Sequence, residues 1–221
     1  MNSPFLSSLL TSSAPPTALV SIVDDDPSVR KALERLLLAS GFTVLCFASG
    51  EDFLASYDPR AGGCLVLDLS MPGLSGHELQ VSLKRAGGVP RIIFLTGHAD
   101  VRDSVQAMKR GATEFLTKPV DDAVLLDAVH TALELDRCAR VTRAVHDGVL
   151  QRIALLTPRE HEVFGHVVTG KLNKQIADDL GTTEKTVKVH RARAMKKMQA
   201  RSLAELVRLA VSVELTLQEV Q

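Results

Sequence analysis

Polar side chains that suit phosphate chemistry stand at the ends of four apolar segments in the first part of the chain. In chain order they are Asp24 with Asp25, Asp68, Thr96 and Lys118. Carboxylate oxygens are hard ligands that suit Mg²⁺, and a carboxylate can attack phosphorus to form an acyl phosphate. An ammonium group and a hydroxyl can bind the oxygens of a transferring phosphoryl group. The set predicts phosphoryl transfer to an aspartate, with Asp68 as the acceptor.

Each of these residues also has an ordinary structural explanation. A single aspartate after a strand often caps the next helix, and a Lys-Pro pair often forms a turn. Asp26, directly before Pro27, fits the start of a helix better than a metal site. Such residues in order at the ends of four segments are much harder to explain structurally, so we favour the chemical interpretation.

Strand-like and helix-like segments alternate from Ala18 to about residue 136. Such alternation is typical of an α/β domain whose parallel sheet is covered on both faces, here a flavodoxin-like doubly wound (βα)5 fold. Ligands bind in this fold at the carboxyl ends of the strands, where the polar positions fall. The expected strands are 18–23, 43–47, 64–67, 91–96 and 114–118, and the expected helices include 76–86, 101–110 and 121–136.

After about residue 137 the strand pattern disappears and four helix starts follow. Two of them have a capping-box pattern, in which a glutamate stands three residues after the capping hydroxyl. Four short helices with a tight turn at residues 181–182 predict a small all-α helix-turn-helix domain. The expected caps are Thr157, which precedes Pro158, then Asn173, Thr183 and Ser202.

The stretch 171–208 holds ten Lys or Arg and four Asp or Glu, which favours contact with phosphates. In a helix that starts at Glu184, Lys188 can reach guanine acceptors and Val189 can contact a thymine methyl. Partial packing inside the domain is the alternative for Val189. The face expected to pack inwards is Val187, Ala194, Met195 and Met198, and the opposite face is Lys185, Lys188, Val189, Ala192 and Lys196.

The composition separates an acidic part from a basic part. Residues 1–138 hold 12 Lys or Arg against 17 Asp or Glu, and residues 139–221 hold 14 against nine. This division favours two partners of opposite charge, one for each part. The alternative is a chance split between two solvated surfaces. Three cysteines without a CxxC spacing, and the lack of a long apolar run, predict a cytoplasmic protein without a disulfide, a zinc site or a membrane span.

These patterns divide the chain into four parts. Residues 1–17 have no charged side chain and are rich in Ser and Pro, which predicts a flexible tail rather than a secretory signal. Residues 18–138 form the α/β domain and residues 156–221 the helical domain. Residues 139–155 are expected to link them, either as a helix or as an irregular segment. Valines that recur every four residues favour a helical linker, whereas Gly148 weakens the prediction of a helix.

The segments around the phosphate-chemistry residues resemble the receiver domain of two-component response regulators. The resemblance covers roughly residues 18–138. It implies that Asp68 accepts a phosphoryl group from a sensor histidine kinase. The matching segments are IVDDD (22–26), LVLDLSMPGLSG (65–76), FLTGHAD (94–100) and EFLTKP (114–119).

The same resemblance assigns roles to the neighbours of Asp68. It implies Mg²⁺ bound by Asp25, Asp68 and the backbone carbonyl of Ser70, with Asp24 acting through water. It also implies a switch pair and a lysine that bridges the phosphoryl group and the carboxylate. The switch pair would be Thr96 and Phe115, and the bridging residue would be Lys118, followed by a cis bond to Pro119.

The segment from Leu156 to Met198 resembles the LuxR-type helix-turn-helix of the NarL/FixJ family of regulators, nearest the FixJ-like branch. The resemblance covers roughly residues 154–212 and implies a positioning helix at 173–180 and a recognition helix at 184–198. Ala192 departs from relatives that have a basic residue there, so their target sequence is not transferable. The implied base contacts are Lys188 and Val189, and the implied backbone contacts are Lys185, Thr186, His190, Arg191 and Lys196.

The expected function is therefore control of transcription, most often activation, rather than enzymatic turnover. Phosphorylation would promote a homodimer and binding to double-stranded DNA, with RNA polymerase as a further partner. The dimer face would be helix four, strand five and helix five, with Val101, Lys109, Val120 and His130 as candidates. Two alternatives stay open: an aspartate-nucleophile phosphohydrolase, and a DNA-binding regulator that uses its receiver only as a dimerisation scaffold.

Overall fold

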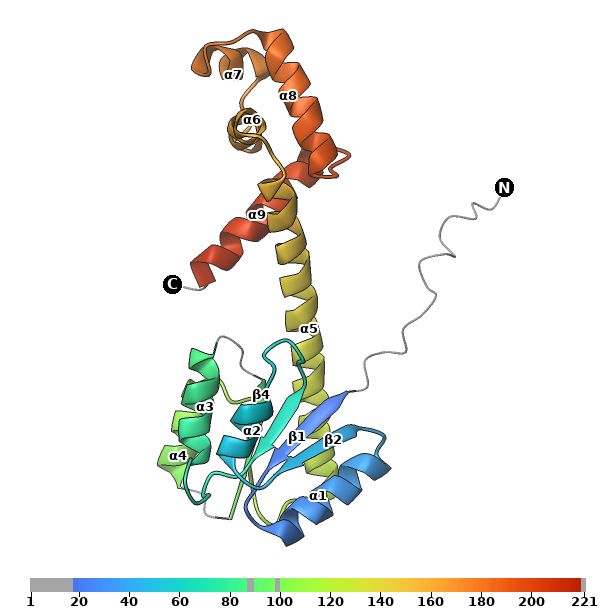
Figure 1. Ribbon diagram of the computed structural model, residues 1–221, viewed down its shortest axis with the longest axis vertical. Helices are drawn as coiled ribbons and strands as arrows, with labels where there is room; N and C mark the ends of the chain where they lie inside the picture. The colour runs from blue at the N-terminus through green and yellow to red at the C-terminus, as the bar shows by residue number, and fades with distance from the viewer. Residues whose placement is uncertain (1–17, 87–89, 98–99, 220–221) are drawn as a thin grey trace, which may run out of the picture. The chain divides into compact units, whose positions relative to one another are not determined.

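The computed structural model describes residues 18–86, 90–97 and 100–219 (Figure 1). The chain divides into two compact units, and the division falls between Arg140 and Val141. Residues 1–17, for which the sequence predicts a tail, lie outside the described residues. No helix in the described part of the chain is both long and apolar enough to cross a membrane.

The first unit is built on a five-stranded parallel sheet with the order β2-β1-β3-β4-β5. The crossover between its two halves places β1 and β3 side by side at the centre. This is the flavodoxin-like doubly wound fold that the alternating segments predict. The strands are β1 (Leu19–Val23), β2 (Thr43–Phe47), β3 (Cys64–Leu67), β4 (Arg91–Thr96) and β5 (Glu114–Thr117).

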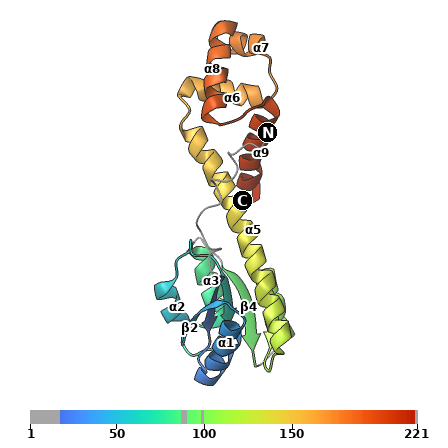
Figure 2. The same cartoon turned by 90° about the vertical axis from the view of Figure 1, so that its right-hand side faces the viewer.

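Helices cover both faces of the sheet (Figures 1 and 2). Apolar residues of α1 and α5 pack on one face, and those of α2 and α3 pack on the other together with Ala107 of α4. The three inner strands, β1, β3 and β4, are buried almost throughout, which explains why they read as continuous apolar runs, whereas the edge strands β2 and β5 are partly exposed. The helices are α1 (Pro27–Ala39), α2 (Gly50–Ser56), α3 (Gly76–Arg85), α4 (Val101–Lys109) and α5 (Asp122–Ala154).

Asp26 caps α1, as the sequence predicts. Its Oδ1 accepts hydrogen bonds from the backbone N–H groups of Ser28, at 2.7 Å, and Val29. Pro27 follows at the first helical position, where its missing N–H costs no intrahelical bond. Asp26 therefore serves the helix and leaves Asp24 and Asp25 as the acidic pair.

The last helix of the sheet domain, α5, continues through residues 139–154, which belong to the predicted linker. The valines of this stretch do not share one environment. Val149 is fully buried in the core of the second unit, whereas Val141 and Val145 are each more than half exposed. Positions four apart advance by about 40° around a helix, so the three valines do not form one buried seam.

A buried carboxylate ties α5 to the turn before β3. Asp136 is 8% exposed, and its Oδ2 accepts a hydrogen bond from the backbone N–H of Gly63 at 3.0 Å. The guanidinium of Arg140, one helical turn further on, lies 2.8 Å from the same oxygen. Because a buried carboxylate without partners is costly, these two contacts are what make the burial of Asp136 tolerable.

Gly63→Ala is expected to destabilise the first unit by about 3 kcal/mol. Gly63 has φ of 112°, and a Cβ at this position would lie 2.5 Å from the backbone oxygen of Leu19. Gly41→Ala is the matched control, because Gly41 has φ of 88° but no heavy atom within 4 Å of such a Cβ. The control should lose only about 1 kcal/mol from the left-handed backbone.

Urea unfolding of the two glycine variants can be followed by the fluorescence of Tyr57, the only tyrosine in a chain that has no tryptophan. Tyr57 packs against the core of the first unit, so its signal reports on that unit. Equal losses in the two variants would contradict the role given to the contact with Leu19.

The second unit is helical (Figure 2). Apolar residues of its helices form one core. In it α8 packs against both α6 and α7, and α9 packs against α6. The pair α7 and α8, joined by a turn in which Gly181 has φ of 60°, is the predicted helix-turn-helix. The helices are α6 (Pro158–Val168), α7 (Asn173–Asp179), α8 (Glu184–Lys197) and α9 (Leu203–Glu219).

Three of the four predicted caps in this unit are present. Thr157 forms the complete capping box, Thr183 Oγ1 accepts from the N–H of Thr186, and Ser202 Oγ accepts from the N–H of Glu205. The prediction for Asn173 is wrong, because α7 begins at Asn173 itself and has no side-chain cap. The N–H of Leu172 is instead satisfied by the Gln175 side chain, at 2.8 Å.

The capping glutamate of α6 also joins α6 to α8. Glu160 is 3% exposed, and its Oε2 accepts hydrogen bonds from Lys197 Nζ at 2.6 Å and from the N–H of Thr157 at 2.9 Å. These bonds, the one from Lys197 first, lower the pKa of Glu160 from 4.5 to about 2. The ionised form is therefore stabilised by folding.

Glu160→Gln is expected to lower the thermal stability of the second unit at neutral pH. A depressed pKa contributes stability that is present above the unfolded value of 4.5 and is lost as the pH falls to about 2. The variant and the parent should therefore converge in melting temperature at low pH. Circular dichroism over this pH range measures the effect. Glu162→Gln, which breaks an exposed pair with Arg159, is the control, and an equal loss there would contradict the account.

Candidate functional site

The carboxyl edge of the sheet brings Asp24 and Asp68 together. Val23 and Leu67 are paired residues of β1 and β3, so the two aspartates that follow them leave neighbouring strands side by side. The backbone N–H of Asp68 continues the pairing, with a 2.8 Å bond to the oxygen of Val23. Both side chains are buried, with Asp24 2% and Asp68 6% exposed. Two carboxylates in this position need a cation.

Lys118 supplies that cation. Its Nζ lies 2.5 Å from Asp24 Oδ2 and 3.0 Å from Asp68 Oδ1. The backbone N–H of Lys118 donates to the oxygen of Thr96 at 2.8 Å, which holds the end of β5 against the end of β4. Thr96 is fully buried at the same edge, and the bond from Lys118 to Pro119 is cis. The structure thus brings together four of the side chains predicted from sequence.

The pKa values at this edge follow from burial and from the shared ammonium group. Burial raises the pKa of Asp68, and the hydrogen bond from Lys118 opposes that rise. For Lys118, burial alone would lower the pKa, but hydrogen bonds to Asp24 and Asp68 outweigh it and raise the pKa. The ammonium group is therefore held in its charged form beside a carboxylate that burial makes more basic.

The predicted metal ligands are only partly assembled. Asp25 is exposed, and the backbone N–H of Ser70 donates to Asp68 Oδ2 at 3.1 Å. Asp24 already bonds Lys118 and the backbone N–H of Asp26, at 2.9 Å. Within residues 18–86, 90–97 and 100–219, no three His, Cys, Asp or Glu side chains lie close enough to hold a metal ion. The ligand set stays a prediction.

The aromatic member of the predicted switch pair lies on the face of the sheet beneath α4. Phe115 is half-buried on β5, and its ring centroid is 6.2 Å from that of Phe94 on β4. Phe94 is fully buried and also contacts the His77 ring at 5.6 Å. Phe115 and His77 therefore both have partial access to solvent, on either side of the buried Phe94 ring.

The helix α8 has the two faces predicted from sequence. Val187, Ala194 and Met198 are buried in the core, with exposures of 0%, 2% and 0%. On the other side Val189 is 43% exposed, which agrees with an outward position rather than packing in the domain. The remaining outward residues, all exposed, are Lys185, Lys188, Ala192 and Lys196.

Several of the predicted DNA-contacting side chains have partners within the unit. Lys188 Nζ lies 3.1 Å from Glu184 Oε1, one turn before it, and Arg191 donates from Nη1 to Asn173 Oδ1 at 3.0 Å. Thr186 shares a hydroxyl hydrogen bond with Thr183. Helical spacing could have revealed the Glu184 contact. The contact between Asn173 and Arg191, eighteen residues apart, depends on how α7 packs on α8.

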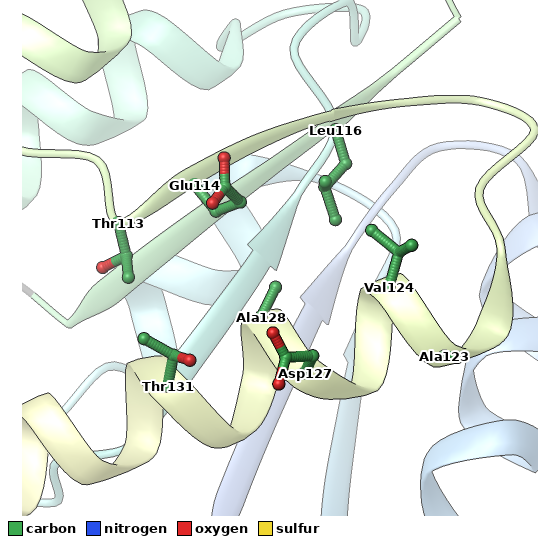
Figure 3. Close-up of a pocket in the computed structure, with 8 residues that line it drawn as sticks. All are labelled: Thr113, Glu114, Leu116, Ala123, Val124, Asp127, Ala128 and Thr131. Carbon is green, nitrogen blue, oxygen red and sulfur yellow. The ribbon is translucent and has the colours of Figure 1, made fainter.

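A groove of about 360 Å³ lies between β5 and α5 (Figure 3). Leu116 and Ala128 belong to its lining, and Glu114 and Asp127 bring acidic groups to it. Val124 also lines it and is 50% exposed, so it does not pack in the core. Of the candidates for the dimer face, His130 is exposed and its ring also contacts that of Phe42, which follows α1, at 5.1 Å.

Two family models match the chain. The model of the response regulator receiver domain matches residues 20–130, and the model of bacterial regulatory proteins of the luxR family matches residues 154–210. The first match contains the buried carboxylates and Lys118. The second contains the whole of α6, α7 and α8.

Similar proteins match over most of the chain. Nodulation protein W of Bradyrhizobium diazoefficiens is 45% identical over 193 residues, which cover 87% of this chain and 85% of that protein. The transcriptional regulatory protein FixJ of Azorhizobium caulinodans is 43% identical over 197 residues, covering 89% and 93%. The solved structure of the response regulator StyR aligns with a TM-score of 0.80 at 46% identity, covering 88% of this chain and 98% of that one.

Proposed function

This chain belongs to the NarL/FixJ family of two-component response regulators, and we propose that phosphorylation of its Asp68 promotes dimerisation and sequence-specific DNA binding. The observation that carries the proposal is the ammonium group of Lys118 between the buried carboxylates of Asp24 and Asp68. The receiver domain would be residues 18–138, the linker 139–155 and the DNA-binding domain 156–221.

The chemistry proposed for Asp68 is nucleophilic attack on a phosphohistidine of a sensor kinase. An Oδ atom forms the new bond to phosphorus, the bond from phosphorus to the histidine nitrogen breaks, and the electron pair leaves with the imidazole. Lys118 then lies beside the phosphorylated carboxyl group and neutralises negative charge on the phosphoryl oxygens. Its contact with Asp24 holds the ammonium group in place for this role.

The charges at this edge suit a divalent cation. Asp24, Asp25 and Asp68 bring three carboxylates to the ends of β1 and β3, and Lys118 offsets only one of them. Mg²⁺ prefers such oxygen ligands and would be held by Asp25, Asp68 and the carbonyl of Ser70, with Asp24 further out. When bound, the ion would supply additional positive charge beside the phosphoryl oxygens.

The proposed output is a population shift toward a dimer. The hydroxyl of Thr96 would bind the phosphoryl group, and Phe115 would turn inward from its partly exposed position. The face of α4, β5 and α5 would then meet a second copy, since Val101 is 76% exposed there and the groove of Figure 3 offers apolar atoms. Two DNA-binding domains would contact two half-sites.

On DNA, α8 would lie in the major groove and α7 across the backbone. Lys188 and Val189 would contact bases. The site of action would be the cytoplasm, with RNA polymerase as a further partner. Backbone phosphates would be bound by Lys185, Thr186, His190, Arg191 and Lys196.

Intact-mass spectrometry tests the phosphorylation step directly. The protein is incubated with acetyl phosphate and Mg²⁺, and the mass is followed with time. We expect one phosphoryl group to add, because a small acyl phosphate can replace the kinase as donor. No mass gain, or steady hydrolysis of small phosphoesters without a mass gain, would contradict the proposal, and the second outcome would favour a phosphohydrolase.

A further inference from the structure

Arg191 of α8 is held by a side chain of the neighbouring helix. Its Nη1 donates to the Oδ1 of Asn173, the first residue of α7, at 3.0 Å. Arg191 and Asn173 are both partly buried, so the bond is shielded from water on one side. It joins the two helices of the helix-turn-helix at the level of the predicted DNA-contacting face.

Asn173 is a residue type that usually caps a helix, but here it does not serve α7. The helix has no side-chain cap, and the N–H of Leu172 is satisfied by Gln175 instead. The amide oxygen of Asn173 is thereby left to accept the bond from Arg191. Because the Asn173 side chain does not cap its own helix, we look for its role in the bond with Arg191.

The neutral amide suits a guanidinium that must keep its charge. A guanidinium has five N–H donors, and the bond to Asn173 uses one of them. A carboxylate at this position would hold Arg191 as well but would neutralise it, as Glu184 does in part for Lys188. The amide therefore orders the side chain while its full positive charge and four donors stay available.

We propose that Asn173 is a positioning residue for DNA binding, which holds the guanidinium of Arg191 toward a backbone phosphate. The proposal rests on the DNA-binding function proposed above and adds to it a residue outside α8. Ordering Arg191 before DNA arrives removes part of the side-chain entropy that binding would otherwise cost. Asn173 itself then needs no contact with DNA.

The test is a set of titrations of the full chain, in the presence of acetyl phosphate and Mg²⁺, against a mixed-sequence duplex of roughly 30 base pairs at several salt concentrations. Arg191→Ala should weaken binding about tenfold and reduce the salt slope by about one, since one phosphate contact is lost. Asn173→Ala should weaken binding about fivefold, because Arg191 keeps its charge but loses its order. Gln151→Ala, which removes an exposed amide on α5, is the matched control and should bind like the parent.

Two further variants separate positioning from a merely structural role. Asn173→Asp should keep the bond to Arg191 but neutralise it, so the salt slope should fall by about one, as in Arg191→Ala. The double variant Asn173→Ala with Arg191→Ala should bind no more weakly than Arg191→Ala alone, because Asn173 acts only through Arg191.

Three results would overturn the inference. The first is parent-like binding by Asn173→Ala, and the second is an additive loss in the double variant. The third is an unchanged salt slope in Asn173→Asp while Arg191→Ala lowers it. If the parent itself does not bind the duplex in a salt-dependent way, the proposed DNA-binding function is contradicted. That outcome differs from the three results above, which contradict only the role given to Asn173. Circular dichroism of each variant checks that α7 and α8 are folded.

Discussion

Asp68→Asn is expected to abolish phosphorylation of the chain and every response that depends on it. Asparagine has nearly the same shape and can still accept the hydrogen bond from Lys118, so the fold should persist. The amide is a far weaker nucleophile than a carboxylate and forms no stable acyl phosphate. With acetyl phosphate and Mg²⁺, the variant should gain no phosphoryl group and should not change its oligomeric state.

The measurement is intact mass together with gel filtration, on the parent and on the variant. Asp52→Asn is the control, because Asp52 is an exposed aspartate at the start of α2. The control should be phosphorylated like the parent. A full mass gain in Asp68→Asn would show that another residue accepts the phosphoryl group.

Lys188→Ala is expected to cost about 1–3 kcal/mol of affinity for the preferred DNA sequence and to relax the preference at one base pair. Lys188 is exposed on α8, and its partner Glu184 lies at the first turn, where recognition helices approach base edges. On binding a guanine, Lys188 would give up its ion pair with Glu184 for a directed contact with the base. Because the pair is exposed, its loss costs little stability.

Lys196→Ala is the comparison for Lys188→Ala. Lys196 lies nearly at the end of α8 and is predicted to contact only the backbone. Its loss should weaken all sequences alike and reduce the salt slope by about one. Selection of binding sites from a randomised duplex pool measures the difference. Identical sequence preferences in the parent and in Lys188→Ala would rule out base contact by Lys188.

Much of the fold follows from local patterns in the sequence. The inner strands β1, β3 and β4 are buried, so they appear as unbroken apolar runs, and residues such as Asp26 and Thr157 mark helix starts by their own chemistry. The continuous course of α5 was harder to predict. Gly148 disfavours a helix by about 1 kcal/mol, and the exposed Val141 and Val145 give no sign of burial.

The candidate site was predictable where topology alone decides it. Carboxyl ends of parallel strands share one edge, so Asp24, Asp68 and Lys118 had to converge. Contacts between distant residues were not predictable in this way. The bond from Gly63 to Asp136 spans 73 residues, and it depends on how the first half of α5 packs on the sheet domain. The prediction that Asn173 caps α7 is wrong for the same reason, because its side chain bonds Arg191 of α8 instead of the backbone of its own helix.

The central claim is that phosphorylation of Asp68 controls the DNA-binding domain. The most direct measurement is a pair of gel-filtration runs and DNA-binding titrations on the parent protein, with and without acetyl phosphate in the presence of Mg²⁺. The account predicts that the donor converts the protein to a dimer and tightens its binding to DNA. Unchanged size and affinity in a protein that is phosphorylated and binds DNA would contradict it, and would leave a constitutive DNA-binding regulator whose receiver is only a scaffold.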